Sequence, residues 1–155
     1  MNFDDLQFTD NYNGMRAYGQ SKLANLLFTY ELSRRLSGTA ITVNALHPGF
    51  VSTHLGKQNE LVRGIMEIIH LFAKSPEEGA KTPVYLASSP DVTNITGGYF
   101  IAQEQVRSSS ESYDTVSMER LWEVSEQLCG LDTSRVQPSV TESAFRVSEA
   151  DYIKS

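Results

Sequence analysis

Apolar side chains recur at three- and four-residue steps from Met15 to about Leu36, which is the period of an amphipathic helix. They form two stripes, Leu23, Leu26, Leu27 and Tyr30 on one face and Ala24, Phe28 and Leu32 on another. Two apolar faces imply two packing partners for this helix. A sheet is expected to be one of them.

The segment from Ala40 to Leu46 is rich in β-branched and apolar residues and predicts a buried strand. Pro48 and Gly49 end this strand, because proline has no amide donor for the ladder and glycine supports a tight turn. The turn then lies at the carboxyl end of the strand. In open parallel sheets, that edge is where nucleotide ligands bind.

A capping box marks the start of a further helix. Ser75 is the predicted N-cap, Pro76 occupies the first helical position, and Glu78 stands three residues after the cap. This helix is expected to end near Ser88. After Gly97-Gly98, a short strand is predicted over residues 99–102.

The remaining segments complete a single domain over residues 1–131. Residues 117–128 have the pattern of an amphipathic helix, and Gly130 is placed to close it. Residues 55–73 carry apolar side chains at helical steps and predict a helical insert, for which core packing is one explanation. Residues 132–155 are rich in Ser, Thr, Glu and Gln, which predicts a disordered tail.

Charge and composition exclude several classes of function. The chain has 155 residues, of which 40% are hydrophobic, enough for a packed core, and its net charge is −6. That charge argues against nucleic acid or an anionic membrane as the main partner, since both require a basic surface. Cys129 is the single cysteine, the three His residues lack metal-type spacing with it, and no apolar run is long enough to span a membrane. We therefore expect a cytoplasmic protein without a metal site.

Tyr18 and Lys22 lie four residues apart in the first predicted helix, so a phenol and an ammonium share one helical face. The positive charge of Lys22 favours the ionised form of the Tyr18 phenol. Such a phenol can exchange a proton with a substrate oxygen while hydride moves at the adjacent carbon. The pair indicates carbonyl redox chemistry, although a surface tyrosine and lysine on a helix can also have no function.

Several stretches, in this order, resemble the short-chain dehydrogenase/reductase family, and most closely its retinol-dehydrogenase-like branch. They are residues 2–7, Ala17-Tyr18 with residues 21–25, His47-Pro48-Gly49 with Val51 and Thr53, and residues 121–125. Together they span residues 2 to about 131. The resemblance implies an α/β fold, a partial doubly wound (Rossmann-like) parallel sheet that lacks its amino-terminal half.

The resemblance also implies the roles of individual residues. Tyr18 would be the catalytic acid/base, and Lys22 would both tune it and hydrogen-bond the nicotinamide ribose of NADP or NAD. The nicotinamide and its phosphates would be held by residues that follow the strand, namely Pro48, Gly49, Val51 and Thr53. The simpler explanation of Thr53 is a helix N-cap.

The partners implied by the resemblance are a small lipophilic alcohol or carbonyl substrate and a second protein surface. The insert of residues 55–73 would cover the substrate as an apolar lid. The second apolar face of the first helix could pack on another subunit in a homodimer.

The chain lacks features with which members of this family begin. A Gly-rich turn that places the pyrophosphate at a helix N-terminus does not occur in it, and neither does the Asn-Ala-Gly stretch or the substrate-binding Ser. Ser21 is no replacement for that Ser, because it lies about 100° from Lys22 around the helix. We therefore expect the chain to require a complementing amino-terminal half. The alternative is a non-catalytic remnant that serves association.

Overall fold

The computed structural model describes residues 1–49 and 75–131. Its elements in chain order are α1 (Gly14–Arg35), β1 (Ala45–His47), α3 (Pro76–Ser88), the 3-10 helix η1 (Pro90–Val92), β2 (Tyr99–Ile101), β3 (Glu104–Val106), the 3-10 helix η2 (Ser110–Tyr113) and α4 (Thr115–Cys129). The predicted insert over residues 55–73 and the predicted tail over residues 132–155 lie outside the described residues. Both therefore stay predictions, as does the domain boundary at residue 131.

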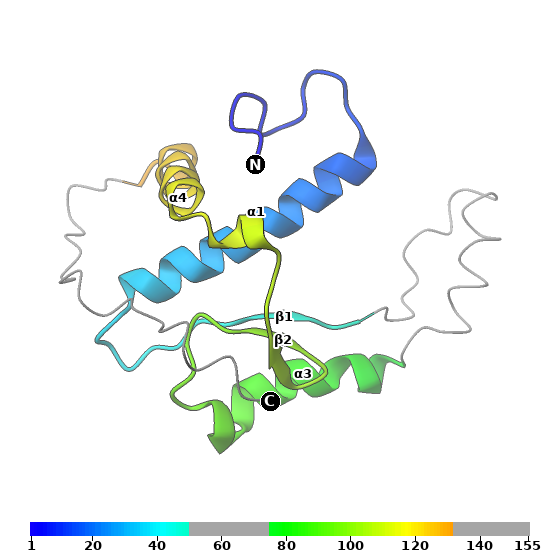
Figure 1. Cartoon of the computed structure of the whole chain (residues 1–155), viewed down its shortest axis with the longest axis vertical. Helices are drawn as coiled ribbons and strands as arrows, with labels where there is room; N and C mark the ends of the chain where they lie inside the picture. Colours follow the sequence, from blue (N-terminus) through cyan, green and yellow to red (C-terminus); the bar gives the residue numbers. More distant parts are fainter. Residues whose placement is uncertain (50–74, 132–155) are drawn as a thin grey trace.

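The described strands form one sheet in the order β1-β2-β3. β1 and β2 are parallel, with His47 opposite Ile101, and β2 and β3 are antiparallel. In Figure 1, α1 lies to one side of β1 and β2, α3 lies to the other side, and α4 packs against α1. Helices on both sides of a parallel strand pair confirm the predicted partial, Rossmann-like α/β fold.

The first strand is shorter than predicted, because a side chain replaces part of its ladder. The prediction covered residues 40–46, whereas β1 begins only at Ala45. Immediately before it, the Asn44 carboxamide accepts a hydrogen bond from the Gly98 amide (2.8 Å) and donates one to the Ile95 carbonyl (2.7 Å). They lie between two backbone hydrogen bonds, from the Gly97 amide to the Val43 carbonyl (2.7 Å) and from the Ala45 amide to the Gly98 carbonyl (2.9 Å). The Asn44 side chain thus binds the Gly98 amide, and the strand register begins only at Ala45.

The predicted N-cap of α3 and the predicted end of α4 are confirmed. The Ser75 hydroxyl accepts a hydrogen bond from the Glu78 amide (3.2 Å), Pro76 is the first residue of α3, and the helix ends at Ser88. Gly130 has φ +64° and closes α4, as expected of a left-handed C-cap.

Other boundaries differ from the prediction by one or two residues. α1 starts at Gly14, because the Asn13 side chain accepts a hydrogen bond from the Arg16 amide (3.0 Å). α4 starts earlier than the predicted Ser117, because Asp114 caps it. β2 ends at Ile101, since the two following residues have positive φ and turn the chain into the unpredicted strand β3.

A cluster of the described core lies between α1 and α4. Leu27, Tyr30 and Met118 are buried together, and Leu23, Leu26, Leu121 and Met1 pack around them. The ring of Phe28 stacks on that of Trp122 with the centroids 5.5 Å apart. Residues from both apolar stripes of α1 thus contact α4 of the same chain. The homodimer stays a prediction.

Tyr30 links this core to η2 through a hydroxyl network. Its hydroxyl is 2.6 Å from the Ser108 hydroxyl, which in turn is 2.6 Å from that of the buried Ser112. Burial is the main cause that raises the pKa of Tyr30 to about 12. The phenol therefore stays protonated and acts as a structural hydrogen-bonding group.

The crowding at Gly98 gives a first testable prediction. A Cβ at Gly98 would lie 2.6 Å from Cε2 of Phe100 and 3.0 Å from Oδ1 of Asn44. Phe100 is only 2% exposed, so its ring is enclosed by neighbouring atoms. We expect Gly98→Ala to lower the free energy of unfolding by about 1–3 kcal/mol, the usual cost of overpacking. Urea denaturation followed by circular dichroism measures this change.

The matched control is Gly19→Ala in α1. A Cβ at Gly19 meets no atom within 4 Å. Because alanine is the better helix former, this variant is expected to raise the free energy of unfolding by up to about 1 kcal/mol. Equal effects of the two substitutions would show that the contacts around Gly98 do not limit the space there.

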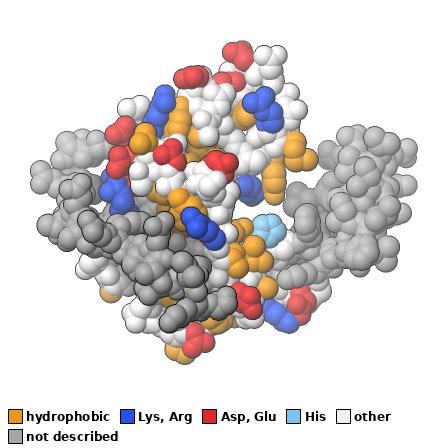
Figure 2. Space-filling view, viewed as in Figure 1, with side chains coloured by type: hydrophobic (Ala, Val, Ile, Leu, Met, Phe, Trp, Pro, Cys, Tyr) orange, Lys and Arg blue, Asp and Glu red, His pale blue; other side chains and the backbone are white. Residues whose placement is uncertain are grey.

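The surface of the described residues carries both signs of charge. On the face shown in Figure 2, Lys and Arg side chains are interspersed with Asp and Glu side chains. Among the described residues, none of the helices is long and apolar enough to cross a membrane. The cytoplasmic location stays a prediction.

Candidate active site

Tyr18 and Lys22 lie on the amino-terminal half of α1 and share one face of the helix, as predicted. The Lys22 ammonium nitrogen is 5.2 Å from the centroid of the Tyr18 ring. At this distance the ring and the cation attract each other. The Tyr18 side chain is 61% exposed and Lys22 is exposed as well. Both polar groups are therefore accessible to a molecule that approaches this face.

Hydrogen bonds connect the segment that precedes α1 to Gln20, two residues after Tyr18 in the helix. The Gln20 side chain accepts a hydrogen bond from the Asn2 amide (2.8 Å) and donates one to the Leu6 carbonyl (3.3 Å). Within the segment, the Asp5 carboxylate accepts hydrogen bonds from the amide and hydroxyl of Thr9. The bond from the Thr9 amide is the largest cause that lowers the pKa of Asp5. These hydrogen bonds hold the loop against the helical turn that contains Tyr18.

Ser21 is not placed to serve the same chemistry as Tyr18. Its hydroxyl donates a hydrogen bond to the Tyr18 carbonyl (2.7 Å) within the helix. The hydroxyl is therefore engaged with the backbone of α1.

The Pro48-Gly49 turn follows directly from the carboxyl end of β1. Gly49 has φ +81°, in the left-handed region that glycine adopts without strain. Its amide donates a hydrogen bond to Nδ1 of His47 (2.8 Å). This bond was not predicted, because a histidine beside a Pro-Gly turn can have many roles. The spacing of two residues between His47 and Gly49 is its only sequence signal.

The structure places two of the predicted groups and leaves a third outside its range. Tyr18 and Lys22 contact each other, and Pro48 and Gly49 lie at the predicted edge of the sheet. In Figure 1, the amino-terminal part of α1 and the carboxyl end of β1 lie toward the same side of the view. Val51 and Thr53 lie outside the described residues, so their roles stay predictions.

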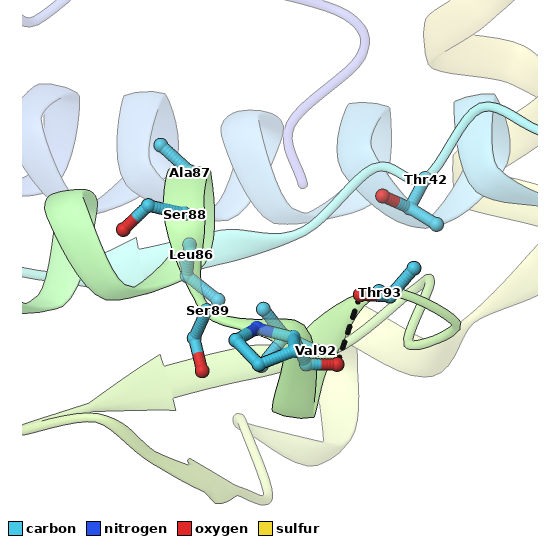
Figure 3. Close-up of a pocket in the computed structure, with 8 residues that line it drawn as sticks. Thr42, Leu86, Ala87, Ser88, Ser89, Val92 and Thr93 are labelled. Atoms are coloured by element: carbon cyan, nitrogen blue, oxygen red, sulfur yellow. Dashed lines mark hydrogen bonds between the residues drawn. The ribbon is translucent and has the colours of Figure 1, made fainter.

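A pocket of about 440 Å³ lies elsewhere, between Thr42, the carboxyl end of α3 and η1 (Figure 3). Thr42 precedes β1, so this pocket is at the opposite end of that strand from Pro48-Gly49. Several of its hydroxyls are bound to backbone groups. Thr93 donates to the Pro90 carbonyl (2.8 Å), and Ser88 donates to that of Val84 (2.7 Å). None of the lining side chains is titratable, so the pocket offers no acid or base.

Metal-ligating side chains are not grouped in the described part of the chain. Within residues 1–49 and 75–131, no three His, Cys, Asp or Glu residues are arranged so that they could hold a metal ion. Cys129 is exposed and carries a free thiol.

Comparison with known proteins relates the chain to one family. Residues 8–62, which include Tyr18, Lys22 and the Pro48-Gly49 turn, match the family model described as short chain dehydrogenase. Over these residues, the chain is similar to this family. Several relatives are retinol dehydrogenases, which confirms the predicted resemblance to the retinol-dehydrogenase-like branch.

Three relatives represent the similarity. Retinol dehydrogenase 14 from Homo sapiens is 44% identical over 135 residues, 84% of this chain and 40% of that protein. Retinol dehydrogenase 13 from Homo sapiens is 42% identical over 149 residues, 92% of this chain and 44% of that protein. Short-chain dehydrogenase TIC 32 A, chloroplastic, from Brassica napus is 38% identical over 129 residues, 81% of this chain and 40% of that protein. The chain therefore spans less than half the length of these relatives.

A solved structure supports the fold of this chain. An uncharacterized protein from Mycobacterium paratuberculosis is 30% identical and superimposes with a TM-score of 0.60. The match covers 84% of this chain and 45% of the other. In structure as in sequence, this chain corresponds to less than half of the protein it resembles.

Proposed function

We propose that this chain supplies the carboxyl-terminal half of an NAD(H)- or NADP(H)-dependent oxidoreductase that interconverts an alcohol and a carbonyl. The observation that carries the proposal is the contact between the Lys22 ammonium and the Tyr18 ring on an accessible helix face. Two relatives are named retinol dehydrogenases, which favours a lipophilic alcohol or carbonyl as the substrate.

Tyr18 is the acid and base of the proposed reaction. In the direction of reduction, its hydroxyl gives a proton to the carbonyl oxygen, and in the direction of oxidation its phenolate takes the proton from the alcohol. Lys22 is proposed to place its positive charge beside that phenolate. The nicotinamide, when bound, supplies or accepts the hydride at the substrate carbon, so that proton and hydride together convert carbonyl to alcohol.

The described residues fit the nicotinamide side of such a cofactor. The Lys22 ammonium can donate hydrogen bonds to the ribose hydroxyls. At the carboxyl end of β1, a ligand can come close to the backbone of the Pro48-Gly49 turn, because glycine has no side chain. Val51 and Thr53 are proposed to extend this contact. The sequence contains no Gly-rich turn for the pyrophosphate, which a complementing amino-terminal half would supply.

Complementation tests the proposal. The chain is produced with the amino-terminal half of retinol dehydrogenase 14, a relative with 44% identity, either fused to it or supplied in trans. We expect the complemented protein, but neither half alone, to oxidise NADH or NADPH in the presence of a lipophilic aldehyde. The single chain lacks contacts to the pyrophosphate and the adenine. The loss of such contacts weakens cofactor binding about tenfold for every 1.4 kcal/mol of binding free energy.

Two results would contradict the proposal. A folded, complemented protein that turns over no alcohol or aldehyde with either cofactor would favour the alternative of an association module. Tight cofactor binding by the chain alone in calorimetry would show that it needs no second half.

A further inference from the structure

The Pro48-Gly49 turn is closed by the side chain of the residue before it. His47 is the last residue of β1, and its Nδ1 accepts a hydrogen bond from the Gly49 amide at 2.8 Å. Because Nδ1 is the acceptor, the neutral imidazole carries its proton on Nε2. The side chain thus holds an amide that lies just beyond the end of the strand.

This hydrogen bond restricts a residue that is otherwise conformationally free. Gly49 has φ +81°, but glycine visits many other conformations at little cost. Pro48 restricts only its own φ and the conformation of His47 before it. The bond from the Gly49 amide to the imidazole favours this one conformation of the glycine.

We propose that His47 is a positioning residue that pre-organises the Pro48-Gly49 turn for the nicotinamide cofactor. This inference rests on the proposed function, since it assumes that the turn contacts the cofactor. A turn already held in its bound conformation loses less entropy when the ligand binds. The effect of His47 is therefore on cofactor affinity and not on the rate of the chemical step, in which Tyr18 acts.

Asparagine and glutamine at position 47 form a matched pair of variants. The carboxamide oxygen of Asn can accept a hydrogen bond from the amide two residues later, as in an Asx turn, and so can replace Nδ1. The longer Gln side chain places its carboxamide nearer to the position of Nε2 and is expected not to close the turn. The two variants have the same functional group and differ only in its reach.

The test uses the complemented protein and two measurements. In calorimetry, His47→Asn should bind NADH or NADPH like the unchanged protein, whereas His47→Gln should bind about fivefold more weakly, as expected from the loss of one neutral hydrogen bond. In the cofactor-free protein, hydrogen exchange of the Gly49 amide should be slow with His or Asn at position 47 and faster with Gln. The kcat of all three proteins should be the same.

Three outcomes would overturn the inference. They are equal weakening by Asn and Gln, unchanged affinity and unchanged Gly49 exchange in both variants, or a loss of kcat without a loss of affinity. The proposed function stands or falls separately. Unchanged His47 variants in a protein that is active and needs Tyr18 would refute only the role of His47.

Discussion

Tyr18→Phe is expected to lower the kcat of the complemented protein by about 100-fold or more, the usual contribution of a positioned acid or base. The substitution removes one hydroxyl and keeps the ring. The contact of the ring with the Lys22 ammonium, at 5.2 Å, needs no hydroxyl and should persist. Cofactor affinity should therefore change little. Steady-state kinetics and calorimetry on the same preparation separate the two effects.

Tyr12→Phe is the matched control for this prediction. Tyr12 is also an exposed tyrosine, with 74% of its surface accessible, but it lies before α1, and the Lys22 ammonium contacts the Tyr18 ring. Removal of its hydroxyl should leave kcat unchanged. Lys22→Ala, by contrast, should lower both kcat and cofactor affinity, since Lys22 is proposed to serve both. Near-normal turnover by Tyr18→Phe would refute the assignment of Tyr18 as acid and base.

Glu31→Ala is expected to lower the free energy of unfolding by about 3 kcal/mol, within the range for removal of one partner of a buried ion pair. The Glu31 side chain is fully buried and binds two guanidinium groups. Arg34 donates to both carboxylate oxygens (2.9 and 3.0 Å), and Arg35 donates to one of them (2.6 Å). The hydrogen bond to Glu31 is the largest cause that raises the pKa of Arg34, so the ion pair favours the charged form of this arginine.

Loss of the Glu31 carboxylate would affect the packing of α1 on α4 as well as the ion pairs. The Arg35 guanidinium lies 4.5 Å from the centroid of the Trp122 ring, and Arg34 also binds Glu119 of α4 (2.8 Å). Without Glu31, the two arginines would be drawn away from these positions toward water. Because their side chains are 35% and 26% exposed, they can reach solvent, which keeps the expected cost at the lower end of the range.

Glu119→Ala is the control for Glu31→Ala. Glu119 also binds Arg34, but the Glu119 side chain is 53% exposed. Exposed ion pairs contribute less than about 1 kcal/mol, so this variant should be close to the unchanged protein in urea denaturation. An equal loss of unfolding free energy in the two variants would show that the contribution of Glu31 does not come from its burial.

Features that depend on neighbouring residues in the chain were predictable from the sequence. Ser75 and Glu78 are three residues apart, Tyr18 and Lys22 are four apart, and Gly130 directly follows the helix that it closes. In each case the contact forms as soon as the helix forms, so the spacing alone indicates it. The Pro48-Gly49 turn was predictable for the same reason.

Only the tertiary structure decided the features that require a distant partner. Glu31 carries a charge that normally lies at the surface, and it is buried because α1 folds against α4 with two arginines beside it. The start of β1 depends on the hydrogen bonds between the Asn44 side chain and the loop before β2, about fifty residues later in the chain. The sequence by itself therefore determined α1, α3 and α4, the Ser75 cap, the Gly130 helix end and the Tyr18-Lys22 pair, because these arise within a few residues. The strand limits, the buried charge and the partners of α1 were decided by contacts that exist only after the chain has folded.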